Sequence, residues 1–144
     1  MPKRRNERLK GCRVLVIEDE YFLADDLDRV LRDEGAEVIG PVGSRSEAMR
    51  LIDRDGFDIA VIDLNLRDES AYPLADELDR QGIPFIFATG YVSAMIPEKY
   101  SRILRWEKPY ELDDIVEGLA PLCDSAMKKQ RPDRPDGIGN SNQL

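Results

Sequence analysis

Short apolar runs alternate with amphipathic helical patterns along most of this chain. An apolar run of about four to eight residues that ends at turn residues is typical of a strand buried on both faces. Such runs occupy residues 12–17, 36–39, 58–64 and 84–88, with a weaker fifth run at 103–106. Strands and helices that alternate in this way predict a parallel sheet covered by helices on both faces. We therefore expect an α/β fold with a doubly wound, five-stranded parallel sheet.

The segments between these runs carry helical stripes and caps. Ser44 and Glu47 form a capping box before one such stripe. The connection from Thr89 to Lys108 differs from the others, because it must also supply the fifth strand and contains a proline. Proline disfavours helix at the residue before it. We therefore expect a short or irregular fourth helix, and we expect residues 90–102 to be the least stable segment of the domain.

Composition assigns the remaining segments and excludes several classes of protein. The chain has 144 residues and a net charge of −8, and no apolar stretch approaches the roughly 20 residues of a membrane span. We expect one domain over residues 12–127, a basic flexible arm over 1–11 and a disordered tail over 128–144. The negative charge disfavours nucleic acid, and no signal-like core follows the arm, so we expect a cytoplasmic protein. Cys12 and Cys123 are interpreted as free, buried thiols.

Polar residues follow four of the expected strands. The first strand ends in the acidic run Glu18, Asp19 and Glu20, and the third strand ends in Asp63. The fourth ends in Thr89, and Lys108 follows the fifth. In a doubly wound sheet these ends meet at one edge, where such folds bind ligands. Three neighbouring carboxylates repel one another, so Mg²⁺ is the expected neutralising ion. Asp63 could then attack a phosphoryl group, with Lys108 stabilising charge and Thr89 donating a hydrogen bond.

Each of these residues also has a structural interpretation. Asp19 alone fits the cap of the following helix, and Asp63 alone fits a turn. Four polar strand ends on the correct strands are harder to explain in this way, and the joint pattern favours a site. The chain contains no histidine, which excludes histidine-based phosphotransfer, most hydrolytic triads and most zinc sites.

Four motifs resemble the receiver domain of response regulators. They are VLVIEDE at 14–20, IAVIDLNL at 59–66, ATG at 88–90 and the dipeptide Lys108–Pro109. The resemblance covers residues 12–124 and implies the CheY-like, flavodoxin-like fold with strand order 2-1-3-4-5. The string PFIFATGY at 84–91 is similar to the variant receivers called the FAT GUY group, which are often single-domain proteins.

The resemblance assigns a phosphoacceptor and a metal site. Asp63 is implied to take the phosphoryl group, with a histidine kinase or a histidine phosphotransfer protein as the donor. Asp19 and Asp63 are implied to bind Mg²⁺ directly and Glu18 through water. Asn65 is implied to offer its backbone carbonyl to the ion.

The resemblance also assigns a switch. Thr89 is implied to be the switch hydroxyl and Lys108 the phosphate-binding lysine, aimed by a cis bond to Pro109. Because residues 90–102 begin beside Thr89, we expect this segment to be the main switch element. Tyr91 is expected to move as the hydroxyl engages the phosphoryl group.

Three features depart from the family pattern. The family usually has an aromatic residue three positions before the lysine, where this chain has Arg105 followed by Trp106. It commonly has a proline and a glycine after the phosphoacceptor strand, where this chain has Arg67 and Ala71. The connection between the fourth and fifth strands is short. We expect a different loop path after Asp63 and altered coupling to the hydroxyl.

The function expected from these residues is a single-domain response regulator of a two-component phosphorelay. Its output would be contact with an unknown protein target, and a homodimer is left open. It would be a switch that takes and loses a phosphoryl group, not an enzyme with turnover. One alternative is a pseudo-receiver that is never phosphorylated. The other is a haloacid-dehalogenase-type phosphatase, whose general acid would stand where this chain has Asn65.

Overall fold

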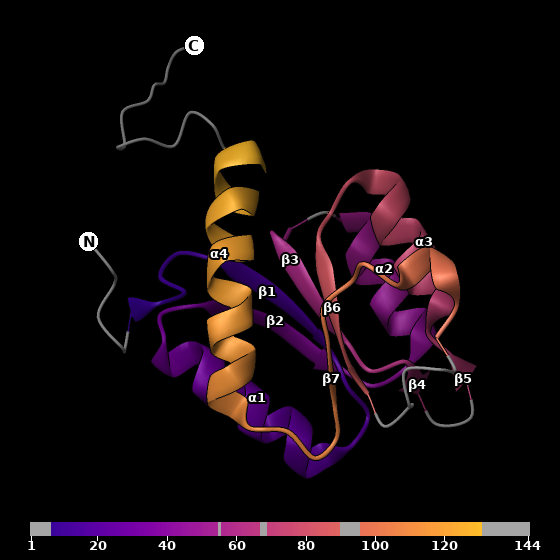
Figure 1. Ribbon diagram of the computed structural model, residues 1–144, viewed down its shortest axis with the longest axis horizontal. Helices are drawn as coiled ribbons and strands as arrows, with labels where there is room; N and C mark the ends of the chain where they lie inside the picture. Colours follow the sequence, from indigo (N-terminus) through magenta and orange to yellow (C-terminus); the bar gives the residue numbers. More distant parts are fainter. Residues whose placement is uncertain (1–6, 55, 67–68, 90–95, 131–144) are drawn as a thin grey trace.

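Five strands form one parallel sheet in the order β2-β1-β3-β6-β7. The computed structural model describes residues 7–54, 56–66, 69–89 and 96–130. This order, shown in Figure 1, is the expected 2-1-3-4-5 order of the doubly wound fold. The strands are β1 (Arg13–Ile17), β2 (Glu37–Val42), β3 (Ile59–Ile62), β6 (Phe85–Thr89) and β7 (Arg105–Glu107).

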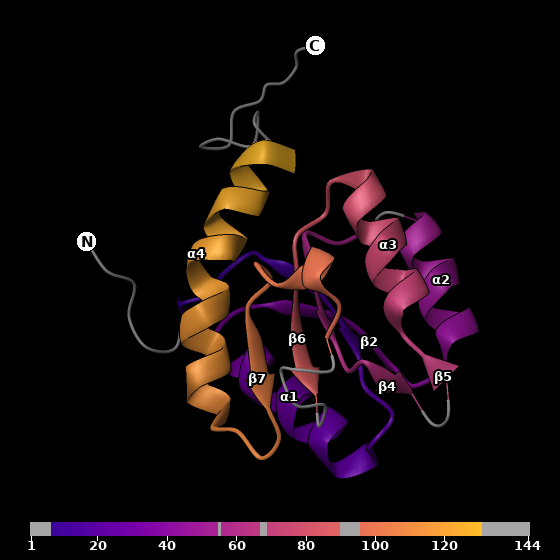
Figure 2. The ribbon, with the colours of Figure 1, turned by 45° about the vertical axis from the view of Figure 1, so that its right-hand side comes forward.

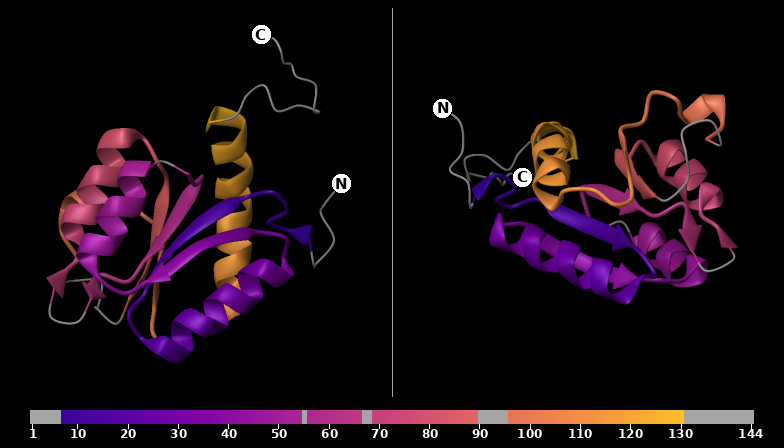
Figure 3. Two further views of the ribbon diagram at one scale, coloured as in Figure 1. Left: turned by 180° about the vertical axis from the view of Figure 1, so that it is seen from behind. Right: turned by 60° about the horizontal axis from the view of Figure 1, so that its bottom comes forward.

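Two helices cover each face of the sheet, and each face has its own apolar core. In Figure 1, α1 (Tyr21–Asp33) and α4 (Leu112–Gln130) lie on the left, and α2 (Arg45–Arg54) and α3 (Tyr72–Gln81) lie on the right. Side chains from α1 and α4 pack with one set of strand residues, and those from α2 and α3 with the other set. Figure 3 gives the same layers from behind and from below. None of the helices in the described ranges is long and apolar enough to cross a membrane.

Several local expectations hold, with shifted boundaries. One half of the capping box forms, because the backbone N–H of Glu47 donates to Ser44 Oγ at 3.2 Å. The second strand runs to Val42, further than the apolar run predicts, and the fifth strand begins at Arg105 rather than at residue 103. The apolar pattern therefore located both strands but not their exact ends, which is the usual precision of such boundaries.

The loop after Asp63 contains a small antiparallel hairpin that the sequence pattern did not predict. Its strands are β4 (Asn65–Leu66) and β5 (Glu69–Ser70). Ala71 follows the hairpin and is fully buried, with its N–H donating to the Leu64 carbonyl at 3.0 Å. β4 and β5 therefore pair antiparallel on the two sides of this loop, and the departure of its path from that of the family stays a prediction.

The connection between β6 and β7 is anchored on α3. Within its described part, the helical structure is one 3₁₀ turn, η3 (Glu98–Tyr100), which agrees with the expected short fourth helix. Tyr100 is buried and stacks on Tyr72 of α3 with ring centroids 5.5 Å apart, and its hydroxyl donates to Asp76. Figure 2 shows this turn between β6 and α3. Residues 90–95, which include Tyr91, lie outside the described residues, so the expected mobility and movement there stay predictions.

Residues 7–11 pack against the domain, which corrects the expectation of a flexible arm over 1–11. Leu9 is fully buried in the α1–α4 core. The Arg8 guanidinium donates to Glu34 at 3.0 Å and to Asp113 at 2.6 Å, which joins the end of α1 to the start of α4. The described helix α4 also continues through residue 130, so residues 128–130 are helical rather than part of a disordered tail. One leucine and one arginine in a polar run give little periodic signal, which is why the sequence pattern missed this packing.

Trp106 of β7 packs directly against Gly118 of α4. A Cβ atom built on Gly118 would lie 2.6 Å from Cζ2 of Trp106 and closer still to Cη2. Glycine therefore serves here to let an indole lie on the helix backbone. The contact ties α4 to the strand that leads into Lys108.

We predict that Gly118→Ala destabilises the domain. Glycine to alanine inside a helix ordinarily stabilises by about 1 kcal/mol, but here the new methyl group must displace the indole, at a cost of about 1–3 kcal/mol. Urea unfolding would measure the change. The double variant Gly118→Ala/Trp106→Leu should recover much of the loss. A Gly118→Ala protein more stable than the parent would refute the packing argument.

Candidate phosphorylation and metal site

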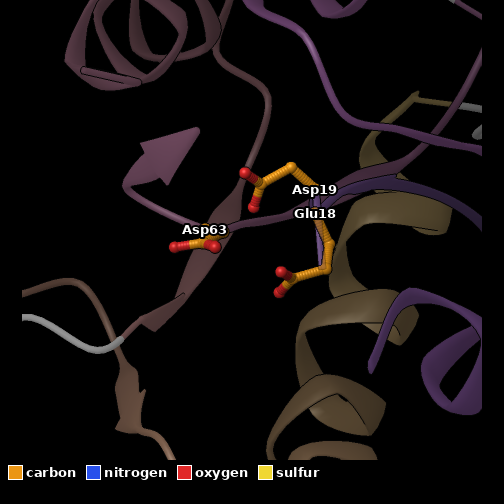
Figure 4. Close-up of side chains that lie close together, drawn as sticks. All are labelled: Glu18, Asp19 and Asp63. Atoms are coloured by element: carbon orange, nitrogen blue, oxygen red, sulfur yellow. The ribbon is translucent and has the colours of Figure 1, made fainter. Parts of the chain in front are cut away.

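Three carboxylates from two neighbouring strands face one another at the carboxyl edge of the sheet. Glu18 and Asp19 follow β1, and Asp63 follows β3. Ile17 pairs with Ile62 in the parallel register, so both strands end at the same level. One carboxylate oxygen from each acid lies within 4.8 Å of the others. Figure 4 shows the three carboxylates turned toward a common space.

Lys108 closes the cluster from the loop after β7. Its Nζ donates to Asp63 Oδ2 at 3.0 Å and to Glu18 Oε2 at 3.1 Å. Burial lowers the pKa of Lys108, but its hydrogen bond to Asp63 and the nearby carboxylates outweigh this and raise the pKa above its ordinary value. Lys108 therefore carries its positive charge in the site. The expected cis Lys108–Pro109 bond is confirmed.

Glu18 is the acid of this cluster whose charged form is opposed by burial. Its side chain is 1% exposed, and Oε1 has no hydrogen-bond partner among the described residues. Burial, together with the charge of Asp63, raises the pKa of Glu18 from 4.5 to about 7, although Lys108 opposes the shift. A buried carboxylate oxygen without a donor is the atom that a cation or a cation-bound water would satisfy.

The donor set fits Mg²⁺. Hard oxygen ligands from a few carboxylates, with room for water, suit this ion. Asp19 lies within the cluster and is only partly buried, so the site is open on one side. The N–H of Asn65 donates to Asp63 Oδ1 at 3.1 Å, which fixes that carboxylate and holds the Asn65 backbone beside it. The exposed Asn65 side chain is consistent with a role for its backbone alone.

Thr89 ends β6 and is fully buried, and its carbonyl accepts the Lys108 N–H at 2.9 Å. The expected hydroxyl and the expected lysine are therefore on directly hydrogen-bonded backbone segments. In β7, Arg105 occupies the position three before Lys108 and pairs with Phe87 in the sheet register. Its neighbour Trp106 packs in the α1–α4 core. The aromatic side chain of β7 thus packs against the helices α1 and α4.

Two further residues lie near the site: Glu20, the third acid of the run after the first strand, and Tyr110, which sequence reasoning missed. Glu20 Oε1 accepts from Lys108 Nζ at 3.5 Å. The hydroxyl of Tyr110 is buried without a hydrogen-bond partner among the described residues, and burial and the nearby acids raise its pKa. The only sequence signal for Tyr110 was its place directly after the Lys108–Pro109 pair.

The family model of the response regulator receiver domain matches residues 14–117. The chain belongs to this family. Among the relatives, the transcriptional regulatory protein PdtaR of Mycobacterium tuberculosis is 26% identical over 111 residues, which are 74% of this chain and 54% of that protein. The phyllosphere-induced regulator PhyR of Methylorubrum extorquens is 31% identical over 120 residues, which are 81% of this chain and 42% of that protein. This receiver chain thus spans about half the length of these relatives or less.

Solved receiver structures agree with the fold. The solution structure of SdrG from Sphingomonas melonis Fr1 has a TM-score of 0.69 and 30% identity, and the match covers 77% of this chain and 95% of that one. The CheY-like receiver domain protein of Methanospirillum hungatei has a TM-score of 0.71, 24% identity and coverage of 82% and 98%. The resemblance and the fold class expected from sequence are confirmed.

We predict that the raised pKa of Glu18 makes the metal-free protein less stable as the pH rises. The folded chain keeps this proton up to about pH 7, whereas the unfolded chain releases it near 4.5. Folding therefore takes up a proton between these values, and stability falls as the pH rises through them. Glu18→Gln should flatten this dependence and add about 1–2 kcal/mol at about pH 8 in EDTA.

Urea unfolding in EDTA at about pH 5 and about pH 8 would measure this effect. Glu37→Gln, which removes an exposed acid where β1 and β2 begin, at the opposite end of the sheet from the cluster, is the matched control. An unchanged pH dependence in Glu18→Gln would show that Glu18 is not the group responsible.

Proposed function

We propose that this receiver accepts a phosphoryl group on Asp63 from a phosphohistidine on another protein. The observation that carries the proposal is the environment of Asp63: a buried carboxylate with Lys108 on one side and the Glu18–Asp19 pair on the other. Oδ2 of Asp63 accepts a hydrogen bond from Lys108 and Oδ1 accepts one from the Asn65 N–H, so both carboxylate oxygens are held in place. A fixed carboxylate beside a cation is poised for nucleophilic attack on phosphorus.

The transfer balances without further reagents. An Asp63 oxygen forms a bond to phosphorus as the bond between phosphorus and the donor imidazole nitrogen breaks, and the product is an acyl phosphate on Asp63. The donor histidine must belong to a kinase or a phosphotransfer protein, because this chain has no histidine. The chain itself changes state and has no turnover reaction of its own.

Asp19, Asp63, the Asn65 carbonyl and, through water, Glu18 would hold Mg²⁺. When bound, the ion neutralises the carboxylates and offsets the charge of the phosphoryl oxygens. Lys108 can exchange its hydrogen bond with Asp63 for one with a phosphoryl oxygen, since its Nζ already lies at that carboxylate. The Thr89 hydroxyl would donate to a second oxygen, and its β6 backbone would transmit the change through Lys108 and toward η3.

The output would be contact with another protein in the cytoplasm. SdrG supports a phosphoryl-driven switch by analogy, because the related solution structure is described as its BeF₃-activated conformation. A pseudo-receiver would not need a lysine bonded to the acceptor carboxylate. A haloacid-dehalogenase-type phosphatase would need a proton donor where this chain has Asn65, whose side chain is exposed and cannot donate as an acid.

We predict that Asp63→Asn abolishes phosphorylation and keeps the fold. Acetyl phosphate with Mg²⁺ should add one phosphoryl group to the parent protein, detected by intact mass and sensitive to hydroxylamine. The same treatment in excess EDTA should leave the parent unmodified. Glu69→Gln, on the nearby hairpin, is the control and should be modified normally. Phosphorylation that persists in Asp63→Asn would disprove the assignment of the acceptor.

Two exposed aromatic side chains stand beside the site at the start of α1. Tyr21 is 76% exposed and Phe22 is 78% exposed, and their rings pack edge to face at 5.5 Å. Phe22 lines the same pocket as Lys108 and Pro109. A protein donor must cover this rim to bring its imidazole to Asp63, so the aromatic pair supports a docking role.

We predict that Tyr21→Ser/Phe22→Ser slows transfer from a phosphohistidine protein by about tenfold or more. Phosphorylation by acetyl phosphate should be unchanged, because a small donor needs no docking surface. The two rates, measured on the same preparation, separate docking from chemistry. Equal slowing with both donors would mean that the aromatic pair supports the site itself.

A further inference from the structure

The turn that leads from β2 into α2 lies against the acidic site without supplying any of its predicted ligands. It comprises residues 42–45, from the end of β2 to the first residue of α2. The Val42 carbonyl accepts from the Glu18 N–H at 2.9 Å, which attaches the turn to the acidic run after β1. Ser44 caps the helix that follows, since its Oγ accepts from the Glu47 N–H at 3.2 Å. The turn is therefore held at both of its ends.

Gly43 brings this turn into contact with a predicted metal ligand. A Cβ atom built on Gly43 would lie 3.1 Å from Asp19 Cα and 3.3 Å from Asp19 Cβ. These two atoms are fixed by the backbone, so Asp19 could not avoid the new methyl group by changing its rotamer. A side chain at position 43 would therefore push Asp19 and the turn apart by a few tenths of an ångström.

Arg45 reaches from the same turn to the Asp63 side of the site. Its Nη1 donates to the Ser70 carbonyl in β5 at 3.0 Å, and its Nη2 lies 3.8 Å from Glu69 Oε2. Ser70 pairs with Asn65 across the β4–β5 hairpin, and the Asn65 N–H donates to Asp63 Oδ1 at 3.1 Å. Figure 2 shows this hairpin beside the ends of α2 and α3. A continuous series of contacts thus links Arg45 to the acceptor carboxylate.

We propose that Gly43 and Arg45 are positioning residues that set the separation between the two halves of the Mg²⁺ site. One half is Asp19 after β1, and the other is Asp63 with the Asn65 carbonyl after β3. Mg²⁺ requires nearly ideal octahedral geometry, so small displacements of its ligands weaken its binding. Residues that orient metal ligands therefore tune metal affinity. The inference rests on the proposed function, because it takes Mg²⁺ to be held by these ligands.

The charge of Arg45 acts on Mg²⁺ in the opposite direction from its positioning role. A positive charge near a cation site repels the cation, so removing the charge alone would strengthen Mg²⁺ binding. Weaker binding in Arg45→Gln would therefore report the loss of the contact with Ser70 and not the loss of charge. Arg50→Gln makes the same change of charge on an exposed residue of α2 and serves as the matched control.

Titration of the full-length protein with Mg²⁺, followed by the NMR shift of the Asn65 amide, tests the proposal. Gly43→Ala should weaken Mg²⁺ binding by about tenfold or more. Arg45→Gln should weaken it by about threefold or more, a smaller loss because this hydrogen bond is exposed to solvent. The Mg²⁺ concentration that gives half-maximal phosphorylation by acetyl phosphate should rise in the same proportion. Gly56→Ala is the matched glycine control, because a Cβ built on Gly56 meets no other described residue within 4 Å.

Urea unfolding in EDTA, run on the same variants, separates positioning from stability. A variant with a lower urea midpoint but the parent's Mg²⁺ affinity would overturn the proposal, as would equal losses of affinity in the two control variants. If Gly43→Ala does not fold, Arg45→Gln on the surface still decides the outcome. A parent protein that binds no Mg²⁺ would instead refute the proposed metal site, so the two failures can be told apart.

Discussion

The parallel pairing of β1 with β3 is the constraint on which the site depends. Because Ile17 and Ile62 are in register, the residues that follow them, Glu18 and Asp63, lie side by side. Both strands are buried on both faces, so neither can shift by one residue without turning its apolar side chains over. The sheet therefore supplies the rigidity that keeps like charges together.

Lys108 reduces the repulsion between these carboxylates but does not cancel it. It contacts both Asp63 and Glu18, but one ammonium cannot balance three carboxylates. The raised pKa of Glu18 and its unpartnered oxygen are two signs of the same imbalance. A site with this excess of negative charge favours the binding of cations. A phosphoryl group, which is itself negative, is favoured there only when a cation is bound beside it. Tight packing elsewhere in the two cores offsets the cost of keeping the site.

The sequence was most informative where burial and function coincide. Strands such as Ile59–Ile62 are apolar throughout, and the polar residue that ends each run could be placed at one edge from topology alone. The cis bond before Pro109 and the order of the strands followed from the family resemblance. Glu18, Asp63 and Lys108 were placed at that edge by the strand pattern, and the resemblance then gave them their expected roles.

Features that depend on one or two contacts could not be predicted. Leu9 and Arg8 stand in a polar run, and only the fold brings Glu34 and Asp113 within their reach. The β4–β5 hairpin has two-residue strands, too short for any periodicity. The role of Gly118 could not be predicted, because nothing in the sequence shows that Trp106 lies over it.

The contact of Arg8 with Asp113 has a consequence for how the chain folds during synthesis. Arg8 leaves the ribosome early and Asp113 late, so the contact that joins them must wait for nearly the whole domain. Until α4 emerges, the face of the sheet that it shares with α1 lacks one of its two covering helices. The nascent protein therefore passes through a one-sided state with exposed apolar strands, the kind of species that chaperones bind and that aggregates when crowded.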